Sequence, residues 1–342
     1  MTKLAASWPG SNFLRRRQFL IALGAGALAA PFGSFAQKQG KVWRVGFLVA
    51  RNRQGVLDSD EFGAIVRSMR ELGYVEGKNL VIEWRFADGK YERLPEQAAE
   101  LVQLKVDLIV ASGSPAISAA QKSTTTIPIV MVNVSDPVGS GFVKSLARPA
   151  GNITGLSNIS LDFSPKLLEM LLSMAPKLSR VAVLVNPANP SHAPILKSVQ
   201  AAAQKRSVNV LPVEIRTAPE IEQAFSAMAR GKAGAIIVPR DALFSDQRRH
   251  IAELAAKHRL PSISALLEYV EAGGLIGYGS SVNEMYRRAA TYVDKIFKGA
   301  NPGDLPVEQP TKFELVINGK TAKALGLKIP QSLLISADKV IQ

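Results

Sequence analysis

Short β-branched runs alternate with amphipathic helical patterns along nearly the whole chain beyond residue 41, and this alternation most constrains the fold. It is typical of α/β proteins with parallel sheets. We expect strands at residues 42–49, 80–86, 108–111, 129–132, 181–185, 208–215, 235–238, 262–264 and 275–279. We expect helices at 61–72, 94–104, 115–122, 165–174, 195–205, 221–229, 246–258 and 284–298.

The second half of the chain repeats the strand pattern of the first. Three pairs of segments are similar in sequence, occur in the same order and are separated by a nearly constant offset. They are 44–49 with 180–185, 105–111 with 232–238, and 127–130 with 260–263. The repeat predicts two doubly wound, Rossmann-like lobes. Ligands of such sheets bind at the carboxyl ends of the strands, beside helix N-termini.

Polar turns follow several of the expected strands. Ser112, Gly113, Ser114 and Pro115 come after one strand and lead into a helix. Free N–H groups and hydroxyls at a helix start suit a carboxylate or another anion. The alternative is that Ser114 only caps its helix. The sequence predicts an anion-binding turn here, with the capping role left open.

Two acids and three other polar residues also follow strands. Asp241 lies in the second lobe close to the position that repeats Ser112, so it can face the anion-binding turn across a cleft. This pairing predicts a zwitterion such as an amino acid. Asp136 can hold an ammonium or cap a helix, and Asp241 can instead be a cap or a surface acid. The residues are Asn133, Ser135, Asp136, Asn186 and Asp241.

Residues 1–36 have the order of an export signal. Arg15, Arg16 and Arg17 precede a mild apolar stretch, and small residues end the segment at Ala36. The Arg-Arg-Gln-Phe-Leu run resembles the twin-arginine (Tat) motif, although Arg15 stands where Ser or Thr is usual. The chain has no Cys for lipid attachment. We therefore expect cleavage near Ala36 and a periplasmic product.

Charge and motifs argue against nucleic-acid binding and against several classes of enzyme. The net charge is +14, but four of the positive charges lie in the leader and the rest are scattered, so we expect a solvated surface and no nucleic-acid partner. Motifs for a serine nucleophile, a phosphate loop or a zinc helix are absent. His192, His250 and His258 stand apart, with general-base use of His192 left open. We predict no catalytic residue, metal or cofactor.

Several segments together resemble one family. They are 72–79, 82–83, 105–110, 135–138, 149–155, 305–308 and 324–330. The family is that of ABC-transporter substrate-binding proteins whose best-known members bind tryptophan or phenylalanine. Ala150 stands at one of the two Gly positions of its Pro-Gly-Gly-Asn pattern. The resemblance implies the type I periplasmic-binding fold, with three crossovers and a ligand at the hinge cleft.

The resemblance also implies site residues and lobe boundaries. Leu57-Asp58 matches the family's Leu-Asp before the first helix, Ser112–Pro115 matches its Gly-Thr/Ser-Pro turn, and Asp136 and Asp241 match its cleft acids. The position after Asp241 is often polar in the family and is Ala242 here. We expect one lobe from 37–156 with 281–307, and the other from 157–280 with 308–342.

These observations favour the solute-binding component of an ABC importer. We expect a monomer that binds a small polar ligand, an amino acid or a related compound, and delivers it to an inner-membrane permease. Two alternatives stay open. One is a periplasmic ligand sensor, which a partner pull-down would separate from transport. The other is an α/β enzyme, which turnover of a substrate would reveal.

Overall fold

A computed structural model describes residues 41–53 and 61–342. The expected leader, its cleavage point near Ala36 and the proposed ligand contact Asp58 lie outside the described residues. Residues 42–342 form one compact unit.

The first sheet has five parallel strands. Their order across the sheet is β2-β1-β3-β4-β5, so the chain moves to one side of β1 and then to the other. The strands are β1 (Trp43–Val49), β2 (Leu80–Phe86), β3 (Leu108–Ser112), β4 (Ile129–Val134) and β5 (Ile153–Ser157).

The second sheet repeats this order and extends it. Its order is β7-β6-β8-β9-β10, followed by β11, which runs antiparallel to β10, and β12. The strands are β6 (Arg180–Val185), β7 (Asn209–Glu214), β8 (Ala235–Val238), β9 (Ser262–Ser264), β10 (Ile276–Gly279), β11 (Glu314–Asn318) and β12 (Lys339–Ile341).

The three repeated segments of the sequence occupy equivalent places in the two sheets. β1 corresponds to β6, β3 to β8, and β4 to β9. The predicted α/β class with two doubly wound lobes is therefore confirmed. We call the part built on the first sheet lobe 1 and the part built on the second sheet lobe 2.

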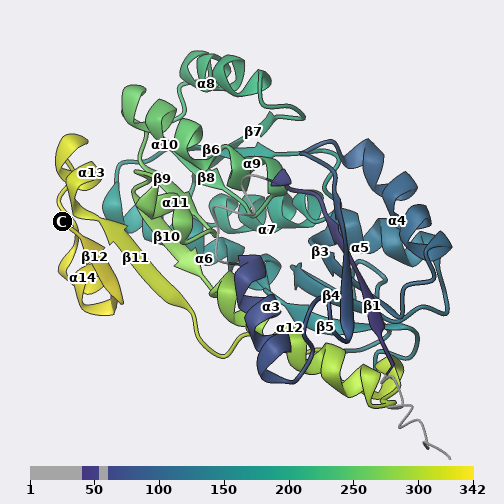
Figure 1. Cartoon of the computed structure of the whole chain (residues 1–342). Coiled ribbons are helices and arrows are strands. Elements are labelled where there is room, and N and C mark those ends of the chain that lie inside the picture. The colour runs from purple at the N-terminus through teal and green to yellow at the C-terminus, as the bar shows by residue number, and fades with distance from the viewer. Residues whose placement is uncertain (1–40, 54–60) are drawn as a thin grey trace, which may run out of the picture. The chain divides into compact units, whose positions relative to one another are not determined.

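Helices cover both faces of each sheet, as Figure 1 shows. In lobe 1, α3 (Glu61–Glu71) and α12 (Val282–Phe297) cover one face, and α4 (Leu94–Gln103) and α5 (Ser114–Ser123) cover the other. In lobe 2, α6 (Ser160–Met174) and α7 (His192–Gln204) lie opposite α8 (Glu220–Arg230) and α10 (Arg248–Lys257). The remaining short elements are η1 (Tyr91–Arg93), α9 (Ala242–Asp246), α11 (Glu268–Glu271), η2 (Pro302–Asp304), α13 (Gly319–Ala324) and α14 (Gln331–Ser336).

Strand side chains alternate between the two helical layers. Phe47 packs with the α3 side of the sheet and Leu48 with the α4 side, and both are buried. Full burial of a side chain of this size contributes about 1.5–3 kcal/mol. Because both faces are covered, the strands are apolar throughout, which explains why they are visible in the sequence.

The chain passes between the sheets more than once. It leaves the first sheet after β5 and enters α6 of lobe 2. After β10 it returns as α12, which packs against α3, and it re-enters the second sheet at β11. The exact lobe boundaries stay our prediction.

Two helices begin at least three residues earlier than their sequence patterns indicate. The helix predicted from residue 165 begins at Ser160, because Pro165 is tolerated inside it: the Ser164 hydroxyl donates to the Leu161 carbonyl, four residues before the proline. The helix predicted from residue 195 begins at His192. The expected helix at 246–258 corresponds to α10, and the short helix α9, which was not predicted, precedes it. Strands β5, β11 and β12 were not predicted.

Candidate functional site

A small polar cavity lies where the strand ends of the two lobes meet. Its volume is about 60 Å³. Lobe 1 contributes residues that follow β1, β3 and β4, and lobe 2 contributes residues that follow β6, β8 and β9. This is the expected place for a ligand, since doubly wound sheets bind ligands at the carboxyl ends of their strands. The lining consists of Val49, Ala50, Arg51, Tyr91, Ser112, Gly113, Ser114, Pro115, Asn133, Ser135, Asn158, Ser160, Asn189, Ser191, Ile195, Arg240, Asp241, Ala242, Ser245 and Leu266.

Seven of the predicted ligand contacts line this cavity. They are Ser112, Gly113, Ser114, Pro115, Asn133, Ser135 and Asp241. Two others, Asp136 and Asn186, are not among its described lining residues. Their role in ligand binding stays a prediction.

The Ser112–Pro115 turn has the geometry of a helix start. Gly113 has φ 81°, in the left-handed region that favours glycine, and Pro115 lies in the first turn of α5. The Tyr286 hydroxyl of α12 donates to the Ser112 hydroxyl at 2.5 Å. The Ser114 Oγ lies 2.6 Å from the Ser191 Oγ of lobe 2. Ser114 makes no side-chain cap, so the capping alternative is not seen.

Asp241 is buried and fully hydrogen-bonded. Its Oδ1 accepts from Leu243 N at 2.9 Å, which caps α9, and from Asn186 Nδ2 at 3.3 Å. Its Oδ2 accepts from Asn189 Nδ2 and from the Tyr91 hydroxyl, both at 2.9 Å. Four donors fill the usual acceptor capacity of a carboxylate. The capping alternative for Asp241 is thus present in the structure.

Asn186 and His192 link the loop after β6 to the strand end that carries Asp241. His192 Nδ1 accepts from the backbone N–H of Asn186 at 2.8 Å, so its Nε2 carries the proton and donates to the Arg240 carbonyl at 3.1 Å. His192 is only 1% exposed. Backbone groups occupy both ring nitrogens, so the histidine orients two cleft loops and has no free nitrogen for general-base chemistry.

The Asp136 side chain stabilises its own loop. Its Oδ1 accepts from the Gly139 backbone N–H at 2.7 Å. Its charge also acts on a neighbour: burial, with Asp136 nearby, raises the pKa of Asp162 in the first turn of α6.

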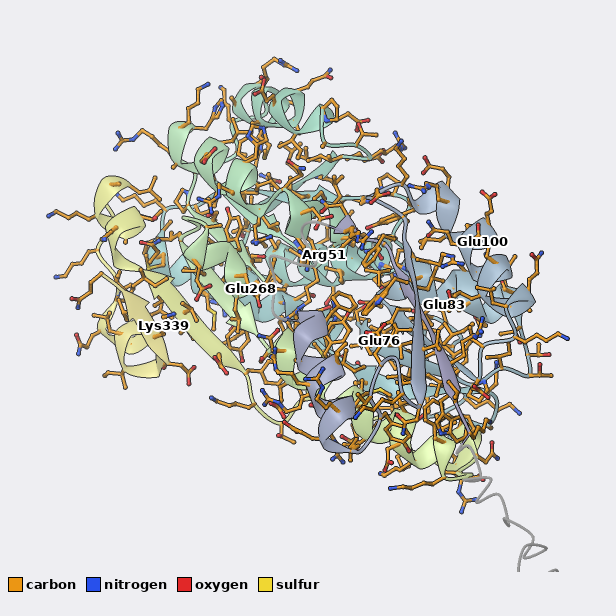
Figure 2. All side chains as sticks on the ribbon, viewed as in Figure 1. Arg51, Glu76, Glu83, Glu100, Glu268 and Lys339 are labelled. Atoms are coloured by element: carbon orange, nitrogen blue, oxygen red, sulfur yellow. The ribbon has the colours of Figure 1, made fainter. Side chains whose placement is uncertain are left out.

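Contacts across the cleft join the lobes at several points. Arg51, labelled in Figure 2, follows β1, and its Nε donates to Asp246 of α9 at 2.8 Å. Burial raises the pKa of Asp246 more than Arg51 lowers it. Arg240 Nη1 lies 3.4 Å from Asn133 Oδ1. Burial, and next the Asp241 charge, raises the pKa of Tyr91 well above its ordinary value, so its hydroxyl stays a donor.

The sequence did not single out Tyr91, Asn158, Ser160, Asn189 or Arg240. Ser160 follows β5, a strand that was not predicted. The position of Arg240, directly before Asp241 and after the end of β8, is the sequence signal that could have identified it as a site residue. No cluster of His, Cys, Asp and Glu with the makings of a metal site occurs in residues 41–53 and 61–342.

This chain is similar to several known proteins. A curated relative, the tyrosine-binding protein of Clostridioides difficile, is 30% identical over 276 residues, which are 80% of this chain and 77% of that protein. A conserved domain protein from Vibrio cholerae has a TM-score of 0.82 at 27% identity, covering 88% of this chain and 100% of that one. A Streptococcus pneumoniae domain in complex with L-Trp has a TM-score of 0.79 at 25% identity, covering 87% and 99%.

The overall structure is more similar to that of the tryptophan complex than to that of a ligand-free, open relative. A ligand-free, open substrate-binding protein from Clostridium difficile has a TM-score of only 0.61, although its identity is 27% and it covers 88% of this chain and 100% of its own. The lower score at similar identity agrees with the hydrogen bonds that join the two lobes here.

The family profile described as ABC transporter substrate binding protein matches residues 57–341. Its members are solute-binding proteins and not enzymes. With two doubly wound lobes, a cavity at their facing strand ends and this match over most of its length, the chain belongs to the ABC transporter substrate-binding protein family.

Proposed function

We propose that this protein is the periplasmic solute-binding component of an ABC importer. The observation that carries the proposal is the cavity between facing strand ends, which is closed by hydrogen bonds from both lobes, including Tyr91 to Asp241 and Ser114 to Ser191. A ligand bound there contacts both lobes and favours their closure. An inner-membrane permease then receives the closed complex.

The ligand is a small polar solute with an acidic group, and amino acids and related compounds are the first candidates. The lining is rich in hydroxyl and amide groups, and the names of two relatives refer to tyrosine and L-Trp. Among residues 41–53 and 61–342, no helix has both the length and the apolar character that a membrane span requires. Periplasmic location rests on the leader, which lies outside the described residues.

Hinge closure is the property to test. We expect a ligand at 100 times its Kd to add about 2.7 kcal/mol to the free energy of unfolding. The same ligand should lower the radius of gyration in solution scattering. Stabilisation without compaction would argue against a closing cleft, and catalytic turnover of the ligand would argue for an enzyme. Capture of a sensor kinase in place of a permease would favour a signalling role.

A further inference from the structure

Three long helices begin at the wall of the cavity. α5, α6 and α7 have 10, 15 and 13 residues, and Ser114, Ser160 and Ser191 lie at their starts and line the cavity. The first N–H groups of a helix have no partner inside the helix, and its N-terminus carries partial positive charge. Three such ends favour a negatively charged group in the cavity.

Ser160 supplies an independent sign of a ligand. It is 3% exposed, it lines the cavity, and its Oγ has no hydrogen-bond partner. The preceding Ile159 has φ 46°, a left-handed conformation that is unusual for a β-branched residue. Buried hydroxyls are normally hydrogen-bonded. A ligand acceptor in the cavity would satisfy this one.

Arg240 brings a positive charge to the same wall. It is 7% exposed, and its Nη2 donates to the Ser280 carbonyl at 2.6 Å, which fixes the guanidinium. Its Nη1 lies near Asn133 Oδ1, which also accepts from Asn158 Nδ2 at 2.7 Å. Asn158 Oδ1 in turn accepts from the Ser160 N–H at 2.8 Å. Arg240 and Ser160 are therefore held in one polar network.

Two described acids near the cavity, Asp241 and Asp246, already accept hydrogen bonds from protein groups. Asp241 receives four protein donors, as described above, and Asp246 accepts from Arg51 and from the Asn52 backbone N–H. A ligand anion thus meets a guanidinium, helix N-termini and hydroxyls, and the two carboxylates are compensated by protein groups.

The remaining lining sets the size and character of the ligand. Apart from Tyr91, no described lining residue is aromatic, and the volume of about 60 Å³ is small. The apolar contacts are aliphatic: Val49, Ala50, Pro115, Ile195, Ala242 and Leu266.

We propose that Arg240 and Ser160 form a carboxylate subsite, and that the ligand is a small aliphatic carboxylate, with or without an amino group. This inference rests on the proposed function and names its substrate class. A guanidinium binds a carboxylate through two parallel hydrogen bonds, which selects it over a neutral amide.

The test compares acids with their amides on the mature chain, residues 37–342. Calorimetry measures Kd for L-alanine, L-valine, lactate and succinate, and for their amides. L-tryptophan, inorganic phosphate and ribitol represent other classes. We expect at least one of the four acids to bind, and its amide to bind at least about tenfold more weakly.

Two variants assign the subsite. Arg240→Met should weaken binding of that acid about 10–100-fold and remove the preference over the amide. Ser160→Ala should weaken binding about fivefold and leave the melting temperature of the ligand-free protein equal or higher, because no protein hydrogen bond is lost. Ser164→Ala is the matched control in the same helix, since Ser164 is buried but does not line the cavity. It should lower the melting temperature and leave Kd unchanged.

The outcomes separate the two proposals. Binding of tryptophan, phosphate or ribitol with compaction, and of none of the four acids, overturns the carboxylate subsite and leaves the solute-binding function. Binding of an acid that neither Arg240→Met nor Ser160→Ala weakens also overturns the subsite. If no compound of any class binds or compacts the protein, both proposals fail. If Arg240→Met does not fold, the comparison of Ser160→Ala with Ser164→Ala decides whether the carboxylate subsite exists.

Discussion

The hydroxyl of Tyr91 in lobe 1 donates to Oδ2 of Asp241 in lobe 2 at 2.9 Å, and the Ala242 N–H donates to the same hydroxyl at 3.2 Å. One tyrosine thus joins the lobes at a carboxylate that also caps α9. Asp241 is 5% exposed, so this contact is shielded from water. It is the kind of interaction that sets the balance between open and closed lobes.

We predict that Tyr91→Phe shifts the ligand-free protein toward open lobes. A hydrogen bond to a charged group contributes about 1.5–3 kcal/mol. Its loss should raise the radius of gyration of the ligand-free protein and weaken ligand binding about tenfold. Solution scattering and calorimetry measure the two effects.

Tyr74→Phe is the matched control. The Tyr74 hydroxyl also donates to an aspartate, Asp294, at 2.9 Å, but both residues belong to lobe 1. We expect it to change stability without changing the radius of gyration or Kd. Equal opening in the two variants would show that the Tyr91 contact has no special part in closure.

Much of the fold was predictable because both sheets are buried on both faces. Apolar runs such as β3 and β8 stand out, and their repetition reveals two lobes of like topology. β5 was not predicted because it is short and contains Gly155. Gly155 has φ 135°, and a Cβ there would lie 2.1 Å from the Met131 carbonyl oxygen. A glycine required by close backbone approach weakens the strand signal.

The site was predictable only where strand ends mark it. The turn at Ser112–Pro115 and Asp241 follow strands directly, so topology places them at the cleft. Tyr91 lies beyond β2 in η1, and nothing in its sequence neighbourhood indicates that it crosses to lobe 2. Arg240 resembles an ordinary surface cation in sequence, and only tertiary packing shows that it is buried. The sequence pattern of strands and turns does not show the direction in which a side chain points, and this is why Tyr91 and Arg240 were missed.

Glu308 gives a pH-dependent prediction. Arg288 of α12 donates to both of its oxygens, at 2.6 and 2.7 Å, and this hydrogen-bonded pair lowers the pKa of Glu308. We predict that Glu308→Gln lowers the free energy of unfolding at pH 7 by about 0.2–1 kcal/mol, because the pair is partly exposed. Urea unfolding of both proteins measures the difference.

The sign of the pH effect follows from the lowered pKa. The folded state binds the Glu308 proton less tightly than the unfolded state, so the carboxylate stabilises the protein above its unfolded pKa of about 4.3. The gap between wild type and Glu308→Gln should close as the pH falls through the lower folded pKa. A gap of constant size down to pH 3 would contradict the assignment. Glu169→Gln, at an exposed pair with Lys166, serves as the control.

Export is testable at the leader. We predict that Arg16→Lys combined with Arg17→Lys traps the precursor in the cytoplasm, because the twin-arginine route requires both guanidinium groups. Fractionation and the apparent mass of the product measure this. Arg15→Lys is the control and should export normally, since this position is not part of the pair. Normal export of the double variant would exclude that route and leave the general one.

The last prediction concerns Asp241, for which the sequence predicted a ligand ammonium as partner. Its four acceptor positions are taken by Leu243, Asn186, Asn189 and Tyr91. We therefore predict that Asp241→Ala lowers the free energy of unfolding of the ligand-free protein by about 2–4 kcal/mol, since several buried donors lose their acceptor.

Asp136→Ala is the control for this variant. Among the described residues, the Asp136 side chain accepts from one backbone N–H only, so its loss should lower the free energy of unfolding by about 1 kcal/mol or less. Urea unfolding without ligand, followed by calorimetry with the acids named above, separates stability from binding. If Asp241→Ala keeps full stability and loses binding, the carboxylate serves the ligand directly, and the ammonium contact predicted from the sequence is correct after all.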